Sequence, residues 1–269
     1  MKRIFTGAAL CFSLILASCS DFLDRDPYED YTDGDMLGSV EGLNTLLNGA
    51  YDIVKGRYYY GALMYQYEAS KGCDFFIRDV GGGTSMSSEA GYAASSTSSG
   101  SAQYAWRTIY SVITNTNLIL DNIDDKTGDI NEIRRIKGEA LALRGLAYFD
   151  LMRLFAYPPR FSYLNPEEPG YDKLTLGVPV IKDSDMSLNP EKYTISRETA
   201  EFTYGYILDQ LTRAKEYLEG RADRQGYINA ATVSALRMRV LLYMERWRDV
   251  ITEGEEWLSK YEGNYTLLT

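Results

Sequence analysis

Residues 133–159 read IRRIKGEALALRGLAYFDLMRLFAYPP. The apolar positions of this stretch recur at spacings of three and four: Ile133, Ile136, Ala140, Leu143, Ala147, Leu151 and Leu154. That spacing is the period of an α-helix that buries one face. Pro158 and Pro159 lack backbone donors, so we expect the helix to end before them. The stretch therefore predicts one long amphipathic helix.

The same periodicity predicts further helices on both sides of this stretch. Their expected ranges are 33–54, 106–120, 196–218, 229–243 and 247–261. Ser196 and Asn229 are predicted to cap two of them, and Gly220 to end one. The last two form a hairpin of about tetratricopeptide length, with Gly254 where the helices approach. No stretch alternates with period two, which indicates an all-α fold.

Two long segments without helical periodicity interrupt these helices. In residues 81–102, Gly, Ser, Ala and Thr fill 19 of 22 positions, so we expect an irregular, flexible segment that builds no core. Residues 157–195 contain six of the seven prolines with tyrosines between them, which favours an ordered excursion. The predicted fold class is all-α, with tetratricopeptide-like helical hairpins and long irregular loop insertions.

The N-terminus has the pattern of an exported lipoprotein. Lys2 and Arg3 precede an apolar run at 4–17 that is too short to span a bilayer and suits a signal peptide. The run ends Leu16-Ala17-Ser18-Cys19, which resembles a bacterial lipobox, in which Cys19 becomes acylated after cleavage. We therefore expect a signal peptide at 1–18, a lipidated acidic tether at 19–32 and a helical domain at 33–269. An ordinary cleavage site and an uncleaved helix remain the alternatives.

Composition excludes several kinds of chemistry. The 269 residues include no histidine, which excludes a Ser-His-Asp triad and histidine-liganded zinc. Acidic residues outnumber basic ones by 38 to 28, which argues against nucleic acid as a partner. We predict no catalytic residue, no metal ligand and no cofactor. A glycosidase needs only two positioned carboxylates and remains open, but the pairs Asp124-Asp125 and Glu255-Glu256 fit solvated helix ends better.

The aromatic residues point to a binding surface. Tyrosine accounts for 23 of them against 9 Phe and 3 Trp, and a tyrosine ring packs while its hydroxyl stays hydrated. Tyr58, Tyr59 and Tyr60 are consecutive on an expected helix, so at least one ring must face outward. Packing against a neighbouring helix and stacking on a ligand are both open for that ring.

Several motifs in a fixed order resemble the SusD/RagB family of surface lipoproteins from Bacteroides-type bacteria. The motifs are Cys19-Ser20-Asp21-Phe22-Leu23-Asp24 with Pro27, Trp106-x3-Tyr110-x2-Ile113-x3-Asn117, Lys137-Gly138-Glu139-Ala140 through Arg144-Gly145 to Phe155, Gly177-Val178-Pro179-Val180, Ser196-Arg197-Glu198-Thr199, and Asn229 through Tyr243 to Trp247. The resemblance implies a lipid-anchored protein on the outer face of the cell outer membrane. It would capture oligosaccharide or polysaccharide for a SusC-like TonB-dependent transporter, and it would break no bond.

The resemblance also has departures. Family members are about twice this length, so the chain resembles an N-terminal half whose C-terminal part is absent. The loop that carries the family's glycan contacts corresponds to the Gly/Ser-rich segment, which has no Trp. The glycan-binding candidates are the aromatic residues that flank this segment: Phe75, Phe76, Tyr92 and Tyr104. A structural or merely exposed role is open for each, and Trp106 is assigned to packing. A transporter-docking scaffold that binds no sugar is the alternative function.

Overall fold

The computed structural model describes residues 33–72, 87–92, 100–162, 175–261 and 263. Within these ranges it contains helices and no strand, apart from one isolated antiparallel bridge between Leu176 and Thr199. The predicted all-α fold is confirmed. Residues 36–269 form one compact unit, and the preceding residues form a separate one, of which only 33–35 are described.

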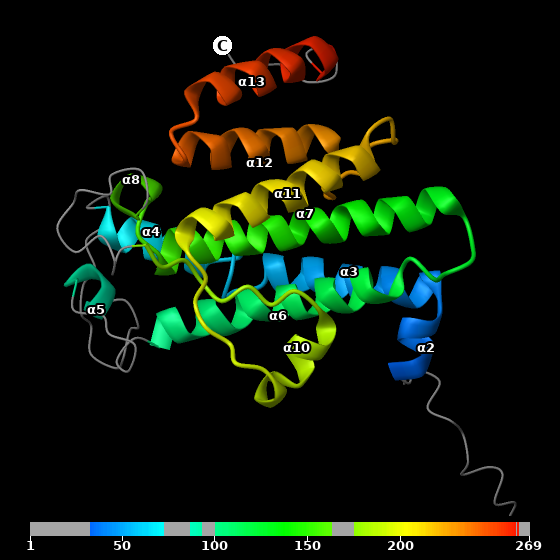
Figure 1. The fold of residues 1–269 in the computed structure, drawn as a ribbon, viewed down its shortest axis with the longest axis horizontal. Helices are drawn as coiled ribbons and strands as arrows, with labels where there is room; N and C mark the ends of the chain where they lie inside the picture. The colour runs from blue at the N-terminus through cyan, green and yellow to red at the C-terminus, as the bar shows by residue number, and fades with distance from the viewer. Residues whose placement is uncertain (1–32, 73–86, 93–99, 163–174, 262, 264–269) are drawn as a thin grey trace, which may run out of the picture. The chain divides into compact units, whose positions relative to one another are not determined.

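Long helices pack side by side in the compact unit (Figure 1). The helices are α2 (Asp33–Gly38), α3 (Val40–Lys55), α4 (Leu63–Lys71), α5 (Ser87–Ala90), α6 (Gly100–Asn122), α7 (Ile130–Phe155), α8 (Pro159–Ser162), α10 (Ser184–Leu188), the short 3-10 helix η2 (Pro190–Lys192), α11 (Ala200–Leu218), α12 (Ala230–Tyr243) and α13 (Trp247–Tyr261). Helix α7 packs against α3, α6 and α11, and α12 lies between α11 and α13. The helices thus stack as successive pairs, in the manner of tetratricopeptide hairpins.

Helix α7 is the centre of the core, as the opening stretch predicts. Ala140, Ala147 and Leu151 on its predicted apolar face are fully buried. Gly145 lets α11 approach closely, because a Cβ there would lie 2.8 Å from Leu211 Cδ2. The helix ends at the cap residue Ala156, before the two prolines. The predicted helix and its end are confirmed.

One predicted helix is divided in the structure, and one predicted helix start is wrong. The expected helix at 33–54 is divided into α2 and α3, because Ser39 is extended and its hydroxyl caps α3 by accepting from Gly42 N at 3.0 Å. Helix α11 begins at Ala200 with Thr199 as its cap, and not at Ser196. Residues 198–200 instead pair with 175–178, with Gly177 N 2.8 Å from Glu198 O. Those backbone hydrogen bonds hold the chain extended up to Thr199.

The predicted end of α11 and start of α12 agree with the structure, whereas α6 begins at Gly100 and not at residue 106. Gly220 follows the end of α11 with a φ of +72°, a conformation that favours glycine. Asn229 caps α12, with its side chain accepting from Thr232 N at 2.8 Å. Helices α12 and α13 form the predicted hairpin, but Gly254 is not required there, since a Cβ would lie at an ordinary 3.5 Å from Met238 Sδ.

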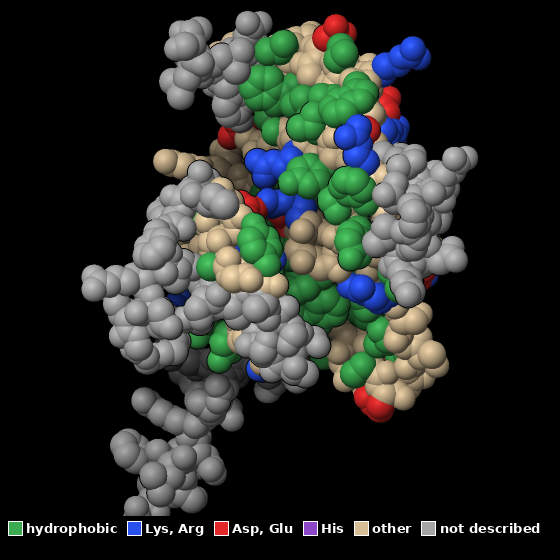
Figure 2. Space-filling model, turned by 90° about the vertical axis from the view of Figure 1, so that its left-hand side faces the viewer, with side chains coloured by type: hydrophobic (Ala, Val, Ile, Leu, Met, Phe, Trp, Pro, Cys, Tyr) green, Lys and Arg blue, Asp and Glu red, His purple; other side chains and the backbone are tan. Residues whose placement is uncertain are grey.

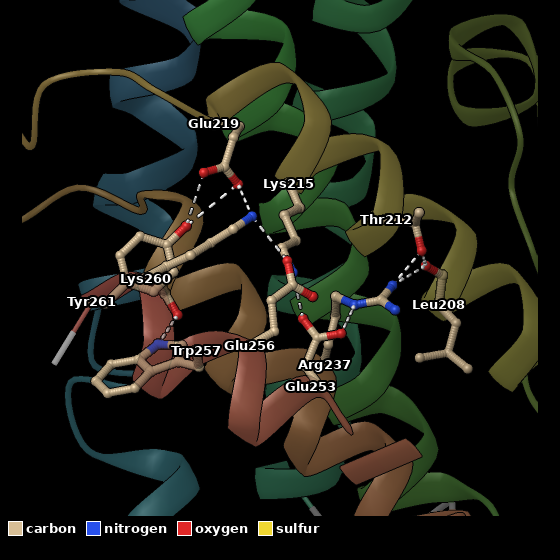
Figure 3. A network of polar contacts seen from close by, with 11 residues as sticks. Leu208, Thr212, Lys215, Glu219, Arg237, Glu253, Glu256, Trp257, Lys260 and Tyr261 are labelled. Carbon is tan, nitrogen blue, oxygen red and sulfur yellow. Dashed lines mark hydrogen bonds and ion pairs between the residues drawn. The ribbon is translucent and has the colours of Figure 1, made fainter. Parts of the chain in front are cut away.

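A charged network joins α11, α12 and α13 (Figure 3). Glu253 of α13 is buried and accepts from Lys215 Nζ at 2.9 Å and from Arg237 Nε at 3.2 Å. Glu256 accepts from the same lysine at 3.1 Å and from Lys260 at 2.9 Å. The Glu256 side chain is 42% exposed and Glu255 is exposed, so both belong to a solvated, charged helix face as predicted, and only Glu253 is buried.

The proline-rich excursion is ordered where the structure describes it, from residue 175 onward. Asn117 of α6 is fully buried, and its amide nitrogen lies 3.1 Å from Ile181 O and 3.0 Å from Asp183 O. Its amide oxygen accepts from Arg144 Nη1 of α7 at 2.8 Å. One side chain thus fastens the excursion to two core helices. Residues 163–174 lie outside the described residues.

The Gly/Ser-rich segment is not wholly irregular. Helix α5 occupies residues 87–90, and α6 already begins at Gly100. Glu89 and Ser101 are buried, to 0% and 2% exposure. The expectation that residues 81–102 contribute nothing to the packed structure is therefore wrong for these two parts. A local pattern could not show this, because small residues fit a tight interior as well as a loop.

Candidate functional site

Four exposed tyrosines gather on elements that contact one another around the start of α6. The exposed fractions are 44% for Tyr58, 62% for Tyr65, 71% for Tyr92 and 46% for Tyr104. They belong to the turn before α4, to α4 itself, to the turn after α5, and to α6, and α4 contacts both α5 and α6. We call these four residues the tyrosine surface. Large exposed aromatic groups of this kind mark interaction sites.

The centre of the tyrosine surface is a stacked pair of rings. The centroids of the Tyr58 and Tyr104 rings lie 4.6 Å apart, and the ring planes meet at 18°. Each ring covers one face of the other, and the two residues remain 44% and 46% exposed. The pair therefore offers a flat apolar platform with hydrogen-bonding groups at its rim.

The three consecutive tyrosines lie in a turn at 56–62, so the prediction that they share a helix is wrong. The turn is closed by Gly61 N donating to Gly56 O at 3.0 Å, and a Cβ at Gly61 would lie 2.4 Å from Lys55 O. Glycine is therefore required at residue 61. The prediction that at least one ring faces outward is confirmed, because Tyr58 is exposed while Tyr59 is fully buried.

Tyr59 fastens this turn to the core. Its hydroxyl donates to Asp150 Oδ2 of α7 at 2.7 Å, and Asp150 Oδ1 accepts from Arg153 Nη1 at 3.1 Å. Arg153 in turn forms an ion pair with Glu68 of α4. Complete burial raises the pKa of Asp150 to about 6, although hydrogen bonds from Tyr59 and Tyr60 act in the opposite direction. The network fixes the backbone that carries Tyr58.

The other two residues of the tyrosine surface, Tyr92 and Tyr65, also contact neighbouring residues of the protein. Tyr92 has a φ of +52°, and its hydroxyl donates to the carbonyl of Lys71, the last residue of α4, at 2.6 Å. The Tyr65 ring lies edge-on to the Tyr60 ring, with centroids 6.2 Å apart. Both rings are exposed yet tethered, which limits the conformational entropy that a ligand would cost on binding.

The structure describes two of the four glycan-binding candidates. Tyr92 and Tyr104 both belong to the tyrosine surface, and the structure adds Tyr58 and Tyr65 to them. Phe75 and Phe76 lie outside the described residues, as does the predicted lipidation site Cys19. The run of three consecutive tyrosines at 58–60 indicates from sequence that one ring, here that of Tyr58, is exposed. No sequence pattern singles out Tyr65.

Trp106 is a packing residue, as predicted. Its ring contacts Tyr110 and Phe155, with centroids 4.8 Å and 5.0 Å away. It also lines a cavity of about 370 Å³ between α6 and the excursion, whose walls include Ile113, Met186, Pro190 and Ile195. The wall is mainly apolar and the Tyr110 hydroxyl is already used on Pro179 O. This cavity has few free polar groups for a saccharide.

The described residues offer no second kind of site. No group of three or more His, Cys, Asp and Glu side chains in those ranges could hold a metal ion. Asp124 forms an ion pair with Lys137, so the pair Asp124-Asp125 is not a free carboxylate pair. Across the described residues, no helix combines the length and the apolar composition needed to cross a membrane.

Stacked helical hairpins place the chain among all-α proteins of the tetratricopeptide type. The comparison with family models identifies it further. The chain belongs to the SusD-like family described as "Starch-binding associating with outer membrane", whose model matches residues 21–239. The resemblance noted in the sequence is confirmed, and the family associates with the outer membrane.

Individual relatives agree with this family. A SusD superfamily protein from Bacteroides thetaiotaomicron superposes with a TM-score of 0.70 and 26% identity, over 86% of this chain and 48% of that one. A SusD-like carbohydrate binding protein from Bacteroides vulgatus gives 0.69 and 25%, over 86% and 46%. A SusD-like protein of Formosa agariphila is 27% identical over 171 residues, which are 60% of this chain and 32% of the relative. The chain thus spans about half the length of the solved relatives.

Proposed function

We propose that this chain binds oligosaccharide through the tyrosine surface and passes it to a SusC-like TonB-dependent transporter. The observation that carries the proposal is the stacked, exposed pair Tyr58 and Tyr104. Membership of the SusD-like family supports a carbohydrate ligand, and one solved relative is a carbohydrate binding protein. We propose that the chain acts by capture alone and breaks no glycosidic bond.

The geometry of the tyrosine surface suits a sugar chain. The apolar face of a pyranose ring packs on an aromatic ring, while its hydroxyls need donors and acceptors at the edge. The exposed pair, together with the exposed Tyr65 and Tyr92 on contacting elements, offers several such contacts to an extended ligand.

The position of the protein in the cell is part of the same proposal. Residues 1–18 act as a signal peptide, Cys19 carries the lipid and residues 19–32 form the tether before the domain at 33–269. Acylation of Cys19 anchors the protein in the cell outer membrane, on the side that faces the exterior. A short acidic tether would keep the tyrosine surface close to the mouth of the transporter.

The test is affinity electrophoresis of the chain from residue 20 onward, against a panel of plant, host and microbial polysaccharides. Tyr58→Ala and Tyr104→Ala are expected to weaken retention by about tenfold each, since one ring–sugar contact is worth about 1 to 2 kcal/mol. Tyr193→Ala is the matched control, because Tyr193 is exposed to 37% and lies outside the tyrosine surface. Reducing-end release is assayed in parallel.

The possible outcomes distinguish glycan capture from a docking scaffold and from an enzyme. Retention that is weakened about tenfold by Tyr58→Ala and unchanged by Tyr193→Ala supports capture by the tyrosine surface. A folded chain that binds the transporter but no polysaccharide would support the docking scaffold instead. Release of reducing ends would overturn the non-enzymatic proposal.

A further inference from the structure

Two exposed arginines flank the stacked tyrosine pair. Arg57 precedes Tyr58 in the turn, and its guanidinium carbon lies 6.0 Å from the centre of the Tyr58 ring. Arg107 follows Tyr104 by one turn of α6, and both side chains are exposed. Residues three apart on a helix lie on the same face, so Arg107 lies on the face of α6 that carries Tyr104. One cation thus lies against the Tyr58 ring, and a second lies one helical turn from Tyr104.

Neither guanidinium is neutralised by a carboxylate of the described residues. The acids on the neighbouring elements are already engaged: Glu68 pairs with Arg153, and Asp150 accepts from Tyr59 and Arg153. Glu89 of α5 is fully buried. The two arginines thus remain available to an anion that comes from outside.

The positive charge of these two arginines is opposite in sign to the net charge of the whole chain. The sequence carries a formal charge of -10. Figure 2 shows the side of the molecule on which α4, α5 and α8 lie, and Lys and Arg side chains gather there among hydrophobic ones near the middle of the face. At physiological ionic strength charges are screened beyond roughly 8 Å, so an approaching anion responds mainly to the nearest groups.

Guanidinium groups have a defined partner chemistry. Their planar fork of donors matches the oxygens of a carboxylate or a sulfate, and such charge-assisted hydrogen bonds are about twice as strong as neutral ones. With a neutral saccharide bound, both guanidinium groups would stay hydrated and would not pair with an anion. A saccharide with an acidic group on or next to the stacked ring would place its anion at the edge of the platform.

We propose that the tyrosine surface selects acidic saccharide chains, with Arg57 and Arg107 binding the anionic groups of sugars that stack on Tyr58 and Tyr104. The acidic group is a carboxylate, as in a uronic acid, or a sulfate ester. This inference rests on the proposed function, because it names the class of saccharide that the same surface takes.

The test compares polymers that share a backbone and differ in charge. Polygalacturonate is compared with highly methyl-esterified pectin, and a sulfated galactan with its desulfated form, by affinity electrophoresis of the chain from residue 20 onward. We expect one charged polymer to bind the protein about tenfold more tightly than its neutral form does. High salt should abolish this difference in affinity. The arm in which this occurs distinguishes a carboxylate from a sulfate.

Charge-removing variants locate the contact. Arg57→Gln and Arg107→Gln are each expected to lower the affinity for the acidic polymer by about tenfold and to leave binding of the neutral polymer unchanged. Lys126→Gln is the matched control, because it removes one positive charge in the turn between α6 and α7, at the other end of α6. Its retention should equal that of the wild type.

The possible results separate the two proposals. Equal retention by the charged and neutral polymers would overturn the preference for acidic saccharides and leave glycan capture standing. Preference for the acidic polymer without an effect of either arginine variant would overturn the assignment to Arg57 and Arg107. Failure to bind any polysaccharide would overturn the proposed function itself.

Discussion

The ring of Tyr58 stacks on the ring of Tyr104, with centroids 4.6 Å apart and planes at 18°. One residue lies in the turn before α4 and the other in the first turns of α6, so the contact joins two separate elements at the solvent boundary. An exposed aromatic pair is useful only if its geometry is fixed. The groups that fix it are therefore as important as the rings themselves.

Tyr59→Phe should destabilise the protein and weaken glycan retention. The variant removes the hydroxyl that donates to Asp150 Oδ2 at 2.7 Å and leaves a buried carboxylate with one donor fewer. We expect a loss of about 2 kcal/mol in the free energy of unfolding, measured by urea denaturation. Tyr65→Phe is the control, since that ring is exposed. Equal stability of the two variants would show that the Tyr59 hydroxyl does not fasten the turn.

Asp150 should make the protein less stable as the pH rises through about 6. Its pKa is about 6 in the folded state against 3.8 for the free side chain, so the folded protein holds this proton more tightly. The contribution is fully present below pH 3.8 and is lost as the pH rises through about 6. The groups that face the carboxylate are Tyr59, Tyr60, Arg153 and Arg239.

The measurement is urea denaturation of the wild type and Asp150→Asn between pH 4 and pH 7. The stability of the wild type relative to the variant should fall by about 3 kcal/mol across this range, which is the value of two pKa units. Asp125→Asn, at an exposed aspartate after α6, is the control and should run parallel to the wild type. A parallel curve for Asp150→Asn would contradict the raised pKa.

Asn117→Ala should release the excursion from α6. The variant removes the amide that lies 3.1 Å from Ile181 O and 3.0 Å from Asp183 O, and it leaves Arg144 without one acceptor. We expect a loss of about 3 kcal/mol of stability and faster proteolysis within residues 175–195. Asn122→Ala is the control, since its side chain bonds only within α6, to Leu118 O. Unchanged cleavage in the excursion would count against this role of Asn117.

The close approach of α7 and α11 can be tested with a pair of glycines. A Cβ at Gly145 would lie 2.8 Å from Leu211 Cδ2, so Gly145→Ala should cost about 1 to 3 kcal/mol through overpacking. A Cβ at Gly205 on α11 would have no atom within 4 Å. Gly205→Ala should therefore stabilise the helix by up to about 1 kcal/mol. Thermal unfolding should give shifts of opposite sign. Shifts of the same sign would mean that the interface adjusts freely.

The sequence predicts the helical core well because the signal is local and repeated. The apolar face of α7 recurs over seven positions, and each of them predicts the same orientation. The helix cap at Thr199 was missed because Ser196 is an equally good cap by type, and the choice depends on backbone hydrogen bonds to residues 175–178. Long-range pairing of this kind leaves no trace in a local pattern.

The candidate site was predictable only in part, for the same reason. Tyr104 could be chosen because it flanks the Gly/Ser-rich segment, but its partner Tyr58 lies in a distant turn that local periodicity assigned to a helix. Asn117 carried a usable signal, since a polar residue at a core position of an apolar stripe requires buried partners. The sequence could not say that those partners belong to the excursion.

Glu253 should stabilise the packing of α13 and should show the opposite pH dependence to Asp150. Burial raises its pKa, but the hydrogen bond from Lys215 and the charge of Arg237 outweigh burial, so the pKa lies below the usual 4.5. The contribution of Glu253 is therefore present above pH 4.5 and is lost as the pH falls through the lowered pKa. Figure 3 shows the carboxylate between cations from α11 and α12.

Glu253→Gln removes one partner of this buried network and leaves Lys215 and Arg237 with less compensation. We expect a loss of about 3 kcal/mol in the free energy of unfolding at pH 7, and a smaller loss once the pH has fallen below 4.5 and through the lowered pKa of the wild-type carboxylate. Glu255→Gln is the matched control, because Glu255 is an exposed neighbour on the same helix and should change stability by less than about 0.5 kcal/mol. If Glu253→Gln were as stable as Glu255→Gln at pH 7, α13 would be held by its apolar contacts alone, and the charged network would only set its register.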